Sequence, residues 1–204
     1  MGQIKVEKNV GEIEGLCVIT PAVHGDSRGY FTETYNQKDM EENGINLTFV
    51  QDNQSMSTKG VLRGLHFQKN FPQTKLVRVI KGSVYDVAVD LRSDSKTYGK
   101  WYGIELTDEN KKQFLIPRGF AHGFLVLSDT AEFCYKCDDF YHPNDEGGMA
   151  WNDPEIGIDW ARIGVKGKYN GTPAADGYTL SDGTPLKLSD KDQKWSGINN
   201  TFKF

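Results

Sequence analysis

The sequence predicts an all-β protein whose architecture is a jelly roll, the double-stranded β-helix. Short apolar segments recur along the chain, and turn-forming residues separate them at intervals of roughly eight to twelve residues. The 22 glycines and seven prolines favour strands and turns over helices. Few short helices are expected, the clearest over residues 36–45, where Gly44 marks the end. In such a fold, a small-molecule site is expected inside the mouth of the barrel.

Alternation of side chains predicts most of the strands. A first strand falls within residues 11–23 and ends at Pro21, and a hairpin joins residues 75–80 to 83–91. In the second arm of this hairpin Asp86 lies mid-strand, where an unpaired carboxylate is costly to bury, so we expect a histidine or lysine partner. Further strands are expected over residues 30–35, 61–66, 101–106, 113–116, 122–127 and 131–137.

The length of 204 residues suits one domain with an extension. We expect a jelly-roll domain over residues 1–160 and an irregular C-terminal extension over residues 161–204 that packs on the same domain. Between 161 and 187 the composition shifts to Gly, Lys, Thr, Pro and Asp, which is typical of irregular structure. Residues 188–192 begin like a capped helix, with Ser189 at the cap.

Composition excludes several classes of partner. The net charge of −4 gives no electrostatic basis for binding nucleic acid or an anionic membrane. No stretch approaches the roughly 20 apolar residues of a membrane helix, and residues 1–10 do not resemble a signal peptide. An odd, low number of cysteines then favours a reduced, cytoplasmic protein. Cys134 and Cys137 are three apart in a predicted strand and so face opposite sides, as small apolar residues rather than a zinc or redox pair.

Residues 59–67 combine a turn, an apolar strand, an arginine and a histidine. Strict alternation places Arg63 and His66 on opposite faces, but a bulge at Gly64 could direct both into one pocket. The alternative is a core strand in which His66 is a buried, hydrogen-bonded residue. A second segment, residues 117–127, places His122 at the start of an apolar strand.

A resident metal is not expected. The spacing Pro117-x-Gly-x-x-His122 resembles the second metal-binding motif of the cupin group. The first motif of that group usually begins His-x-His, whereas here Gly64 precedes His66. Two histidines fall short of the three or four ligands that a metal needs. We therefore predict a cupin-like jelly roll without metal, in which the histidines serve acid–base chemistry. The absence of a Gly-x-Gly-x-x-Gly motif is consistent with no dinucleotide cofactor.

Two further groups of residues have alternative interpretations. Arg28, Phe31 and Glu33 could bind a ligand that carries a phosphate, a flat ring and a hydroxyl, or could form an exposed turn and an edge strand. Tyr135 could be a core tyrosine with a hydrogen-bonded hydroxyl, or an acid directed into a pocket.

Several segments together resemble the dTDP-4-dehydrorhamnose 3,5-epimerase family of sugar-nucleotide epimerases. They occur in one order, and the resemblance runs over residues 13–160 and returns at 188–193. The segments are Arg63-Gly-Leu-His-Phe-Gln68, Lys75-Leu-Val77, Gly82 to Arg92, Pro117 to Phe124, Tyr135-Lys136 and Trp151-Asn-Asp-Pro154.

The resemblance implies four catalytic residues in the 1–160 domain and its extension. His66 is then the base, Tyr135 the acid on the opposite face of the sugar, and Lys75 the cation near the C4 oxygen. Asp192 is the partner that orients His66. Because that alignment crosses the 161–187 excursion, Asp190 and Asp182 are the alternative partners.

The resemblance also implies the substrate contacts. Arg63 and His122 then line the sugar or diphosphate site, and Asp86 holds His122 or Lys75. Tyr141 lies by the diphosphate or the thymidine. The remaining contacts meet the nucleotide, the first three from the neighbouring subunit of a homodimer: Arg28, Phe31, Glu33, Gln51 and Asn53.

The implied reaction converts dTDP-4-dehydro-6-deoxy-D-glucose to dTDP-4-dehydro-L-rhamnose without a cofactor. A ketone acidifies the neighbouring C–H bonds, and inversion needs a base on one face, an acid on the other and a donor at the enolate oxygen. The alternatives are a C3-only epimerase or ketoisomerase of a related dTDP-4-keto-6-deoxy sugar, a metal-dependent cupin oxygenase, and a silent sugar-nucleotide-binding module.

Overall fold

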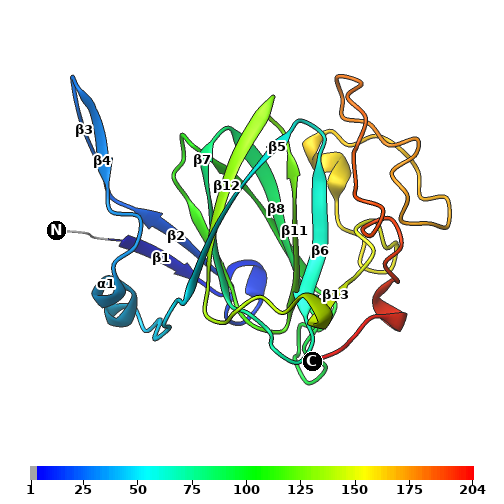
Figure 1. Ribbon diagram of the computed structural model, residues 1–204, viewed down its shortest axis with the longest axis horizontal. Helices are drawn as coiled ribbons and strands as arrows, with labels where there is room; N and C mark the ends of the chain where they lie inside the picture. The colour runs from blue at the N-terminus through cyan, green and yellow to red at the C-terminus, as the bar shows by residue number, and fades with distance from the viewer. Residues whose placement is uncertain (1–3) are drawn as a thin grey trace.

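A barrel of two packed antiparallel β-sheets forms the centre of the molecule in the computed structural model, which describes residues 4–204 (Figure 1). One sheet has the strand order β1 (Ile4–Lys8), β2 (Cys17–Pro21), β10 (Gln113–Ile116), β7 (Lys75–Lys81), β12 (Thr130–Cys137) and β5 (Gln51–Thr58). The other has the order β13 (Glu146–Gly148), β6 (Leu62–Gln68), β11 (Phe120–Val126), β8 (Ser83–Asp90) and β9 (Trp101–Thr107). The predicted all-β jelly roll is therefore confirmed.

Helices are short and lie outside the barrel. The one α-helix, in the part of the chain from residue 4 onward, is α1 (Gln37–Glu42), which Asn36 caps by accepting a hydrogen bond from the backbone N–H of Asp39. The remaining helical turns are of the 3-10 type: η1 (Val10–Glu12), η2 (Pro143–Asp145), η3 (Trp160–Ile163) and η4 (Ile198–Asn200). The helix expected near residues 36–45 is confirmed.

The core between the two sheets follows from strand alternation. On β8, Val84 and Ala88 point into the space between the sheets, where Val77 and Phe133 of the six-stranded sheet meet them. The other face of β8, which includes Val87, packs outside the barrel. The side chains of β8 therefore alternate between the space inside the barrel and its outer face.

Each sheet is covered on its outer face by chain from one end of the protein. Met40 of α1 packs with Ile19 and Leu115 on the outer face of the six-stranded sheet. Trp160 and Tyr178, from the C-terminal part, pack with Tyr85 on the outer face of the five-stranded sheet. In Figure 1 this C-terminal part, yellow to red, lies along one side of the barrel. The irregular segment therefore contributes to a core.

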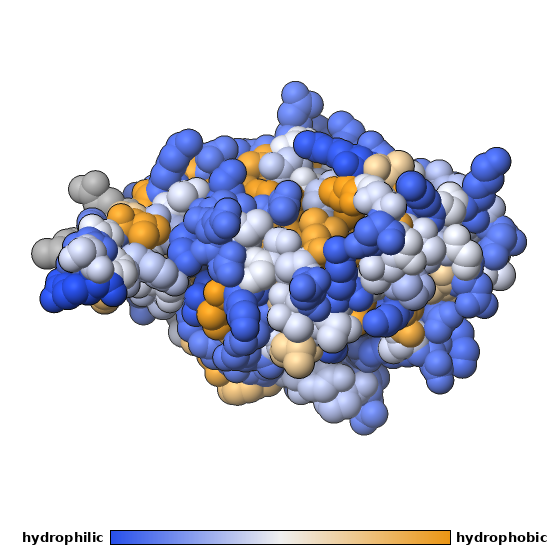
Figure 2. Space-filling view, turned by 90° about the horizontal axis from the view of Figure 1, so that it is seen from above, coloured by the Kyte–Doolittle hydropathy of each residue, from blue (hydrophilic) through white to orange (hydrophobic). Residues whose placement is uncertain are grey.

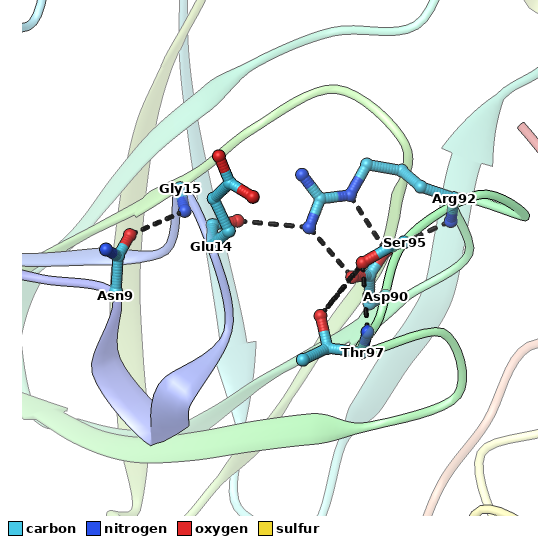
Figure 3. Close-up of polar contacts among 7 residues, drawn as sticks. All are labelled: Asn9, Glu14, Gly15, Asp90, Arg92, Ser95 and Thr97. Atoms are coloured by element: carbon cyan, nitrogen blue, oxygen red, sulfur yellow. Dashed lines mark hydrogen bonds and ion pairs between the residues drawn. The ribbon is translucent and has the colours of Figure 1, made fainter.

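A buried carboxylate ties the end of β8 to the N-terminal region (Figure 3). Asp90 is fully buried and accepts hydrogen bonds from Arg92, Ser95 and Thr97 at 2.7–3.0 Å. Arg92 also donates to the backbone carbonyl of Glu14 at 3.0 Å. Burial raises the pKa of Asp90, but these hydrogen bonds outweigh it and leave the pKa below its ordinary value. The carboxylate is therefore held charged by its own loop.

A two-stranded ribbon, β3 (Val23–Asp26) and β4 (Gly29–Thr32), projects away from the barrel (Figure 1). Its apolar side chains are open to solvent: Tyr30 is 60% exposed and Phe31 66% exposed. In the view from above, most of the visible surface is hydrophilic, with apolar groups showing near the middle and toward the end that carries the ribbon (Figure 2). The ribbon is therefore a separate two-stranded sheet and belongs to neither sheet of the barrel.

Four strands and one turn differ from the expectations. β1, β3, β5 and β13 were not predicted, because their sequences are charged, polar or glycine-rich and lack apolar alternation. The helix expected at residues 188–192 is wrong. Ser189 does accept a hydrogen bond from the backbone N–H of Asp192, but the segment forms a turn only.

The bulge expected at Gly64 is confirmed. In the pairing of β6 with β11, His66 is opposite His122 and Arg63 is opposite Phe124, so β6 carries one extra residue. Gly64 has a φ of 129°, and a Cβ there would lie 2.6 Å from the Cα of Gly123. Only glycine fits this close approach of two strands.

Residues 4–204 contain neither a helix that could span a membrane nor a disulfide bond. Within residues 4–204 no helix has the length and apolar character to cross a membrane. The cysteines Cys17, Cys134 and Cys137 are free and buried. Burial raises the pKa of the Cys137 thiol to about 11, so this sulfur is protonated at neutral pH.

Candidate active site

A cavity of about 600 Å³ opens inside the barrel and is closed on one side by the C-terminal segment. Both sheets and residues 187–192 contribute to its wall. The polar and charged side chains that line it are Ser55, Arg63, His66, Lys75, His122, Tyr135, Tyr141, Glu146, Lys187, Ser189, Lys191 and Asp192. All four predicted catalytic residues therefore lie in one cavity.

His66 and Asp192 form a hydrogen-bonded pair in this wall. The Nε2 atom of His66 lies 2.5 Å from the Oδ1 atom of Asp192, across 126 positions of sequence. Because Nε2 is engaged by the carboxylate, Nδ1 is the nitrogen that can accept a proton. Asp192 is the partner that the sequence favoured; of the alternatives, Asp182 pairs instead with Lys59 at 2.6 Å and Asp190 is exposed.

The Asp192 carboxylate is buried and held on both oxygens. The backbone N–H of Gly64 donates to Oδ2 at 3.4 Å, and the indole of Trp195 donates to Oδ1 at 3.2 Å. Burial raises the pKa of Asp192, but the hydrogen bond and charge of His66 and the other donors outweigh it, so the pKa lies below its ordinary value. The group is therefore a carboxylate at neutral pH.

Tyr135 and Lys75 come from the opposite sheet. They lie on neighbouring strands, β12 and β7, and line the cavity that His66 enters from β6. Burial raises the pKa of the Tyr135 phenol, which therefore stays protonated as an acid needs. Desolvation lowers the pKa of the Lys75 ammonium, which makes its protons easier to share with an oxygen beside it.

His122 and Asp86 form a second pair, deeper in the barrel. Nε2 of His122 lies 3.0 Å from both carboxylate oxygens of Asp86. Burial lowers the pKa of His122 and raises the pKa of Asp86. The prediction that a histidine or lysine would satisfy Asp86 is confirmed. Asp86 itself is fully buried behind His122 and does not line the cavity.

The other predicted substrate contacts fall into two groups. At the cavity, Arg63 is held by a hydrogen bond from its Nε to Ser57 Oγ at 3.0 Å, and Tyr141 lines the rim. Gln51 bonds to Asn53 at 3.0 Å and accepts a hydrogen bond from the backbone N–H of Tyr141 at 2.9 Å, which puts both amides beside the rim.

The residues of the projecting ribbon are not brought to the cavity of their own chain. Arg28 lies at the ribbon tip and pairs with Asp26 at 2.6 Å, and Phe31 is exposed on β4. Glu33, just after β4, accepts a hydrogen bond from Asn36. The ribbon that carries them points away from the barrel and therefore away from the cavity of its own chain (Figure 1).

Sequence reasoning missed several residues of the cavity wall. Lys191 forms an ion pair with Glu146 at 2.7 Å, which joins the C-terminal segment to β13. Lys187 also lines the cavity. Its backbone carbonyl accepts a hydrogen bond from the backbone N–H of Leu62, which joins the C-terminal segment to β6. The only signal for Lys191 was its place beside Asp192, and Glu146 had none, because β13 shows no strand pattern.

The nitrogen donors of the site do not match a metal centre. His66 and His122 each engage an aspartate, and no group of three or more possible ligands lies together in residues 4–204. A catalytic zinc or iron in a comparable site uses at least three protein ligands. These side chains are instead arranged for proton transfer.

An imidazole of one sheet and a phenol and a desolvated ammonium of the other line one cavity, an arrangement suited to acid–base chemistry such as that of an isomerase. The family model described as dTDP-4-dehydrorhamnose 3,5-epimerase matches residues 11–200, and the chain belongs to this family. It is an epimerase. The family resemblance seen in the sequence is thereby confirmed.

Curated relatives and solved structures agree. The dTDP-4-dehydrorhamnose 3,5-epimerase of Methanothermobacter thermautotrophicus is 58% identical over 148 residues, 72% of this chain and 80% of the relative. That of Escherichia coli is 54% identical over 151 residues, 73% of this chain and 82% of the relative. The Legionella pneumophila enzyme in complex with dTDP-4-keto-L-rhamnose superposes with a TM-score of 0.84 at 42% identity and covers 99% of both chains.

A solved structure of a different specificity is also similar. ChmJ from Streptomyces bikiniensis, a 3'-monoepimerase in complex with dTDP-quinovose, has a TM-score of 0.76 at 28% identity and covers 91% of this chain and 85% of its own. The fold therefore serves epimerases that differ in the number of carbons inverted.

Proposed function

We propose that the chain converts dTDP-4-dehydro-6-deoxy-D-glucose to dTDP-4-dehydro-L-rhamnose, a step of dTDP-L-rhamnose biosynthesis, with His66 as base and Tyr135 as acid. The observation that carries the assignment of roles is the placement of these two side chains on opposing sheets around one cavity of about 600 Å³. A hexose held between them presents one face to each.

The proposed reaction begins at a C–H bond beside the C4 ketone. Nδ1 of His66 takes the proton, and the electron pair of the C–H bond moves onto the C4 oxygen as an enolate. The Lys75 ammonium offers a hydrogen bond to that oxygen, where charge develops. The phenol of Tyr135 returns a proton to the same carbon from the other face, and the configuration inverts. Once His66 has released its proton to solvent and Tyr135 has regained one, repetition at the second carbon gives the doubly inverted sugar.

Asp192 supports this cycle through its contact with His66. Its pKa lies below the ordinary value, so the carboxylate stays charged beside the imidazole at neutral pH. The charge stabilises the imidazolium that forms when His66 holds the substrate proton. The bond also fixes the ring, so that one nitrogen remains directed to its task.

The charged wall of the cavity suits a nucleoside diphosphate sugar. Arg63, His122 and Tyr141 lie where they could contact the sugar and the diphosphate, and Gln51 and Asn53 adjoin Tyr141. Two negative charges on a diphosphate match a wall that carries more cationic than anionic groups.

We further propose a homodimer in which each projecting ribbon completes the nucleotide site of the other subunit. Arg28 and Phe31 offer a cation and a flat ring at a distance from their own cavity, and Phe31 and Tyr30 are exposed. An arginine, an aromatic ring and the carboxylate of Glu33 fit a phosphate, a base and a ribose hydroxyl. A light-scattering mass of twice the chain mass is the expected result; a monomeric mass at full activity would contradict it.

The proposed compartment is the cytoplasm. Its support is the state of the three cysteines, which are free and buried in the described part of the chain.

The similarity to ChmJ makes a C3-only epimerase the second candidate. The experiment is conversion of dTDP-4-dehydro-6-deoxy-D-glucose in D₂O, followed by NMR of the sugar. Deuterium at both C3 and C5 of an inverted product supports the double epimerase. Deuterium at C3 alone supports the second candidate, and no deuterium at either carbon contradicts both and leaves a binding module.

A further inference from the structure

The indole of Trp195 lies behind the His66–Asp192 pair. Its Nε1 donates to Asp192 Oδ1 at 3.2 Å, the same oxygen that lies 2.5 Å from His66 Nε2. The indole and imidazole rings meet edge to face, with centroids 6.4 Å apart and an interplanar angle of 73°. One side chain therefore contacts both members of the pair.

Trp195 does not belong to the cavity wall. Among the described residues, those that line the cavity include Asp192 but not Trp195. The indole is half-buried. Any influence on the reaction must therefore pass through the His66–Asp192 pair, which the indole contacts.

Gly148 makes room for the indole. An ideal Cβ on Gly148 would lie 2.5 Å from Cε2 and 2.6 Å from Nε1 of Trp195, so the ring rests directly on the backbone of β13. Gly148 is also the residue opposite His66 in the β13–β6 pairing. The strand that seats the indole is thus the neighbour of the strand that carries the base, which fixes the two rings relative to one another.

We propose that Trp195 is a positioning residue of the epimerase, which fixes the Asp192 carboxylate so that Oδ1 faces His66. A carboxylate can turn about its Cβ–Cγ bond and present either oxygen. Here the indole N–H holds Oδ1 while the backbone N–H of Gly64 holds Oδ2. With both oxygens engaged, the orientation of the imidazole is set before substrate binds. This inference rests on the proposed role of His66 as base.

The indole also acts on the charge of the pair. Its N–H dipole stabilises the carboxylate and so weakens the pull of Asp192 on a proton of the dyad. Other charged or titratable groups line the cavity beside the pair, and the Trp195 variant changes none of them. These groups are Arg63 on β6, His122 on β11, Lys75 on β7, Tyr135 on β12, Glu146 on β13, and Lys187 and Lys191 in the C-terminal segment.

The test is Trp195→Phe, which keeps an aromatic ring and removes the N–H. We expect kcat to fall about tenfold, the scale of one hydrogen bond to a charged group, with KM unchanged. We also expect the acid limb of the kcat/KM profile to move to higher pH, because the carboxylate draws a proton onto the dyad more strongly. A structural role alone would move neither the limb nor kcat at constant KM.

The matched control is Trp160→Phe. Trp160 also donates its indole N–H, to the backbone carbonyl of Trp151 at 2.8 Å, but on the outer side of the five-stranded sheet. This variant loses the same type of bond and should keep the wild-type kcat and pH profile. Thermal unfolding of both variants checks that each is folded.

A second variant removes the bond without touching Trp195. Gly148→Ala introduces a methyl group where the indole rests, and so should displace the ring and reproduce the loss in kcat. In the double variant the two effects should not add, because both remove one interaction. Gly148→Ala alone, measured against wild type, serves as the test if Trp195→Phe does not fold.

The inference is overturned if Trp195→Phe keeps the wild-type kcat and acid limb, or if Trp160→Phe changes them equally. Additive losses in the double variant would overturn it as well. Failure of the proposed function is a separate result: wild-type protein that incorporates no solvent deuterium, or His66→Ala that incorporates it normally, refutes the role of His66 itself.

Discussion

The two histidine–aspartate pairs of this barrel are chemically alike and differ in their setting. In the first, the imidazole of His66 is 25% exposed, faces the cavity and meets a single oxygen of Asp192 at 2.5 Å. In the second, His122 is 8% exposed and lies 3.0 Å from both oxygens of a completely buried Asp86. The two histidines occupy facing positions on the neighbouring strands β6 and β11.

The difference shows how burial assigns roles to identical groups. Asp192 receives enough hydrogen bonds to outweigh its burial, and its pKa falls. Asp86 does not, so its pKa rises while the pKa of His122 falls, which favours the uncharged forms of that pair. In the proposed mechanism the first pair takes up a proton from the substrate, and the second holds a neutral hydrogen-bonding group in the wall.

The largest expected effect distinguishes the two histidines. His66→Ala removes the base, and solvent exchange at C3 and C5 should fall by about 10³-fold or more, within the range of acid–base groups. His122→Asn keeps a polar group in the wall and should retain measurable exchange with a raised KM. NMR exchange rates in D₂O measure both. Equal losses in the two variants would erase the proposed division between the pairs.

A smaller effect is expected at the two carboxylates. Asp192→Asn removes the charge beside His66, and kcat should fall by about 10²–10⁴-fold. Asp86→Asn should change kcat by about tenfold or less, because its partner is neutral and the residue does not touch the cavity. Steady-state kinetics of the two Asp→Asn variants make a matched comparison. Full activity of Asp192→Asn would move the supporting role to another group.

The smallest effect is on stability as a function of pH. Because the folded-state pKa of Asp192 is lowered, its ionisation stabilises the fold above the ordinary value of 3.8, and this contribution is lost as pH falls through the folded pKa. Because the pKa of Asp86 is raised, ionisation of Asp86 costs stability, and that cost disappears as pH falls.

Urea unfolding of wild type and both Asp→Asn variants checks these signs, from about pH 6 down to about pH 3. The stability advantage of wild type over Asp192→Asn should shrink on acidification. Over the same fall in pH, the free energy of unfolding of wild type should rise relative to that of Asp86→Asn. Parallel pH dependences in the two comparisons would show that the settings of the two aspartates do not differ.

Local sequence chemistry predicted the parts of the site that depend on short-range rules. The bulge was predicted at Gly64 because a glycine within a strand allows two backbones to approach closely. In the structure the backbone that it approaches is that of Gly123. The partner of Asp86 followed from the cost of burying a lone carboxylate. Both inferences needed only a few neighbouring residues.

What the sequence could not supply depends on tertiary contact. β5 and β13 are held by pairing with β12 and β6, and their own residues carry no strand pattern. The bond from Trp195 to Asp192 requires the indole to be seated on Gly148, 47 positions earlier in the chain. The ion pair of Lys191 with Glu146 likewise joins segments that only the folded barrel brings together.

The most direct test of the account separates removal of the proton from its return. In Tyr135→Phe the base is intact and the acid is missing. We therefore expect deuterium from D₂O to enter the sugar at carbons beside the ketone while the starting configuration is kept, with little inverted product. Rapid inversion in this variant would contradict the account, because the proton on the second face would then come from a group other than Tyr135.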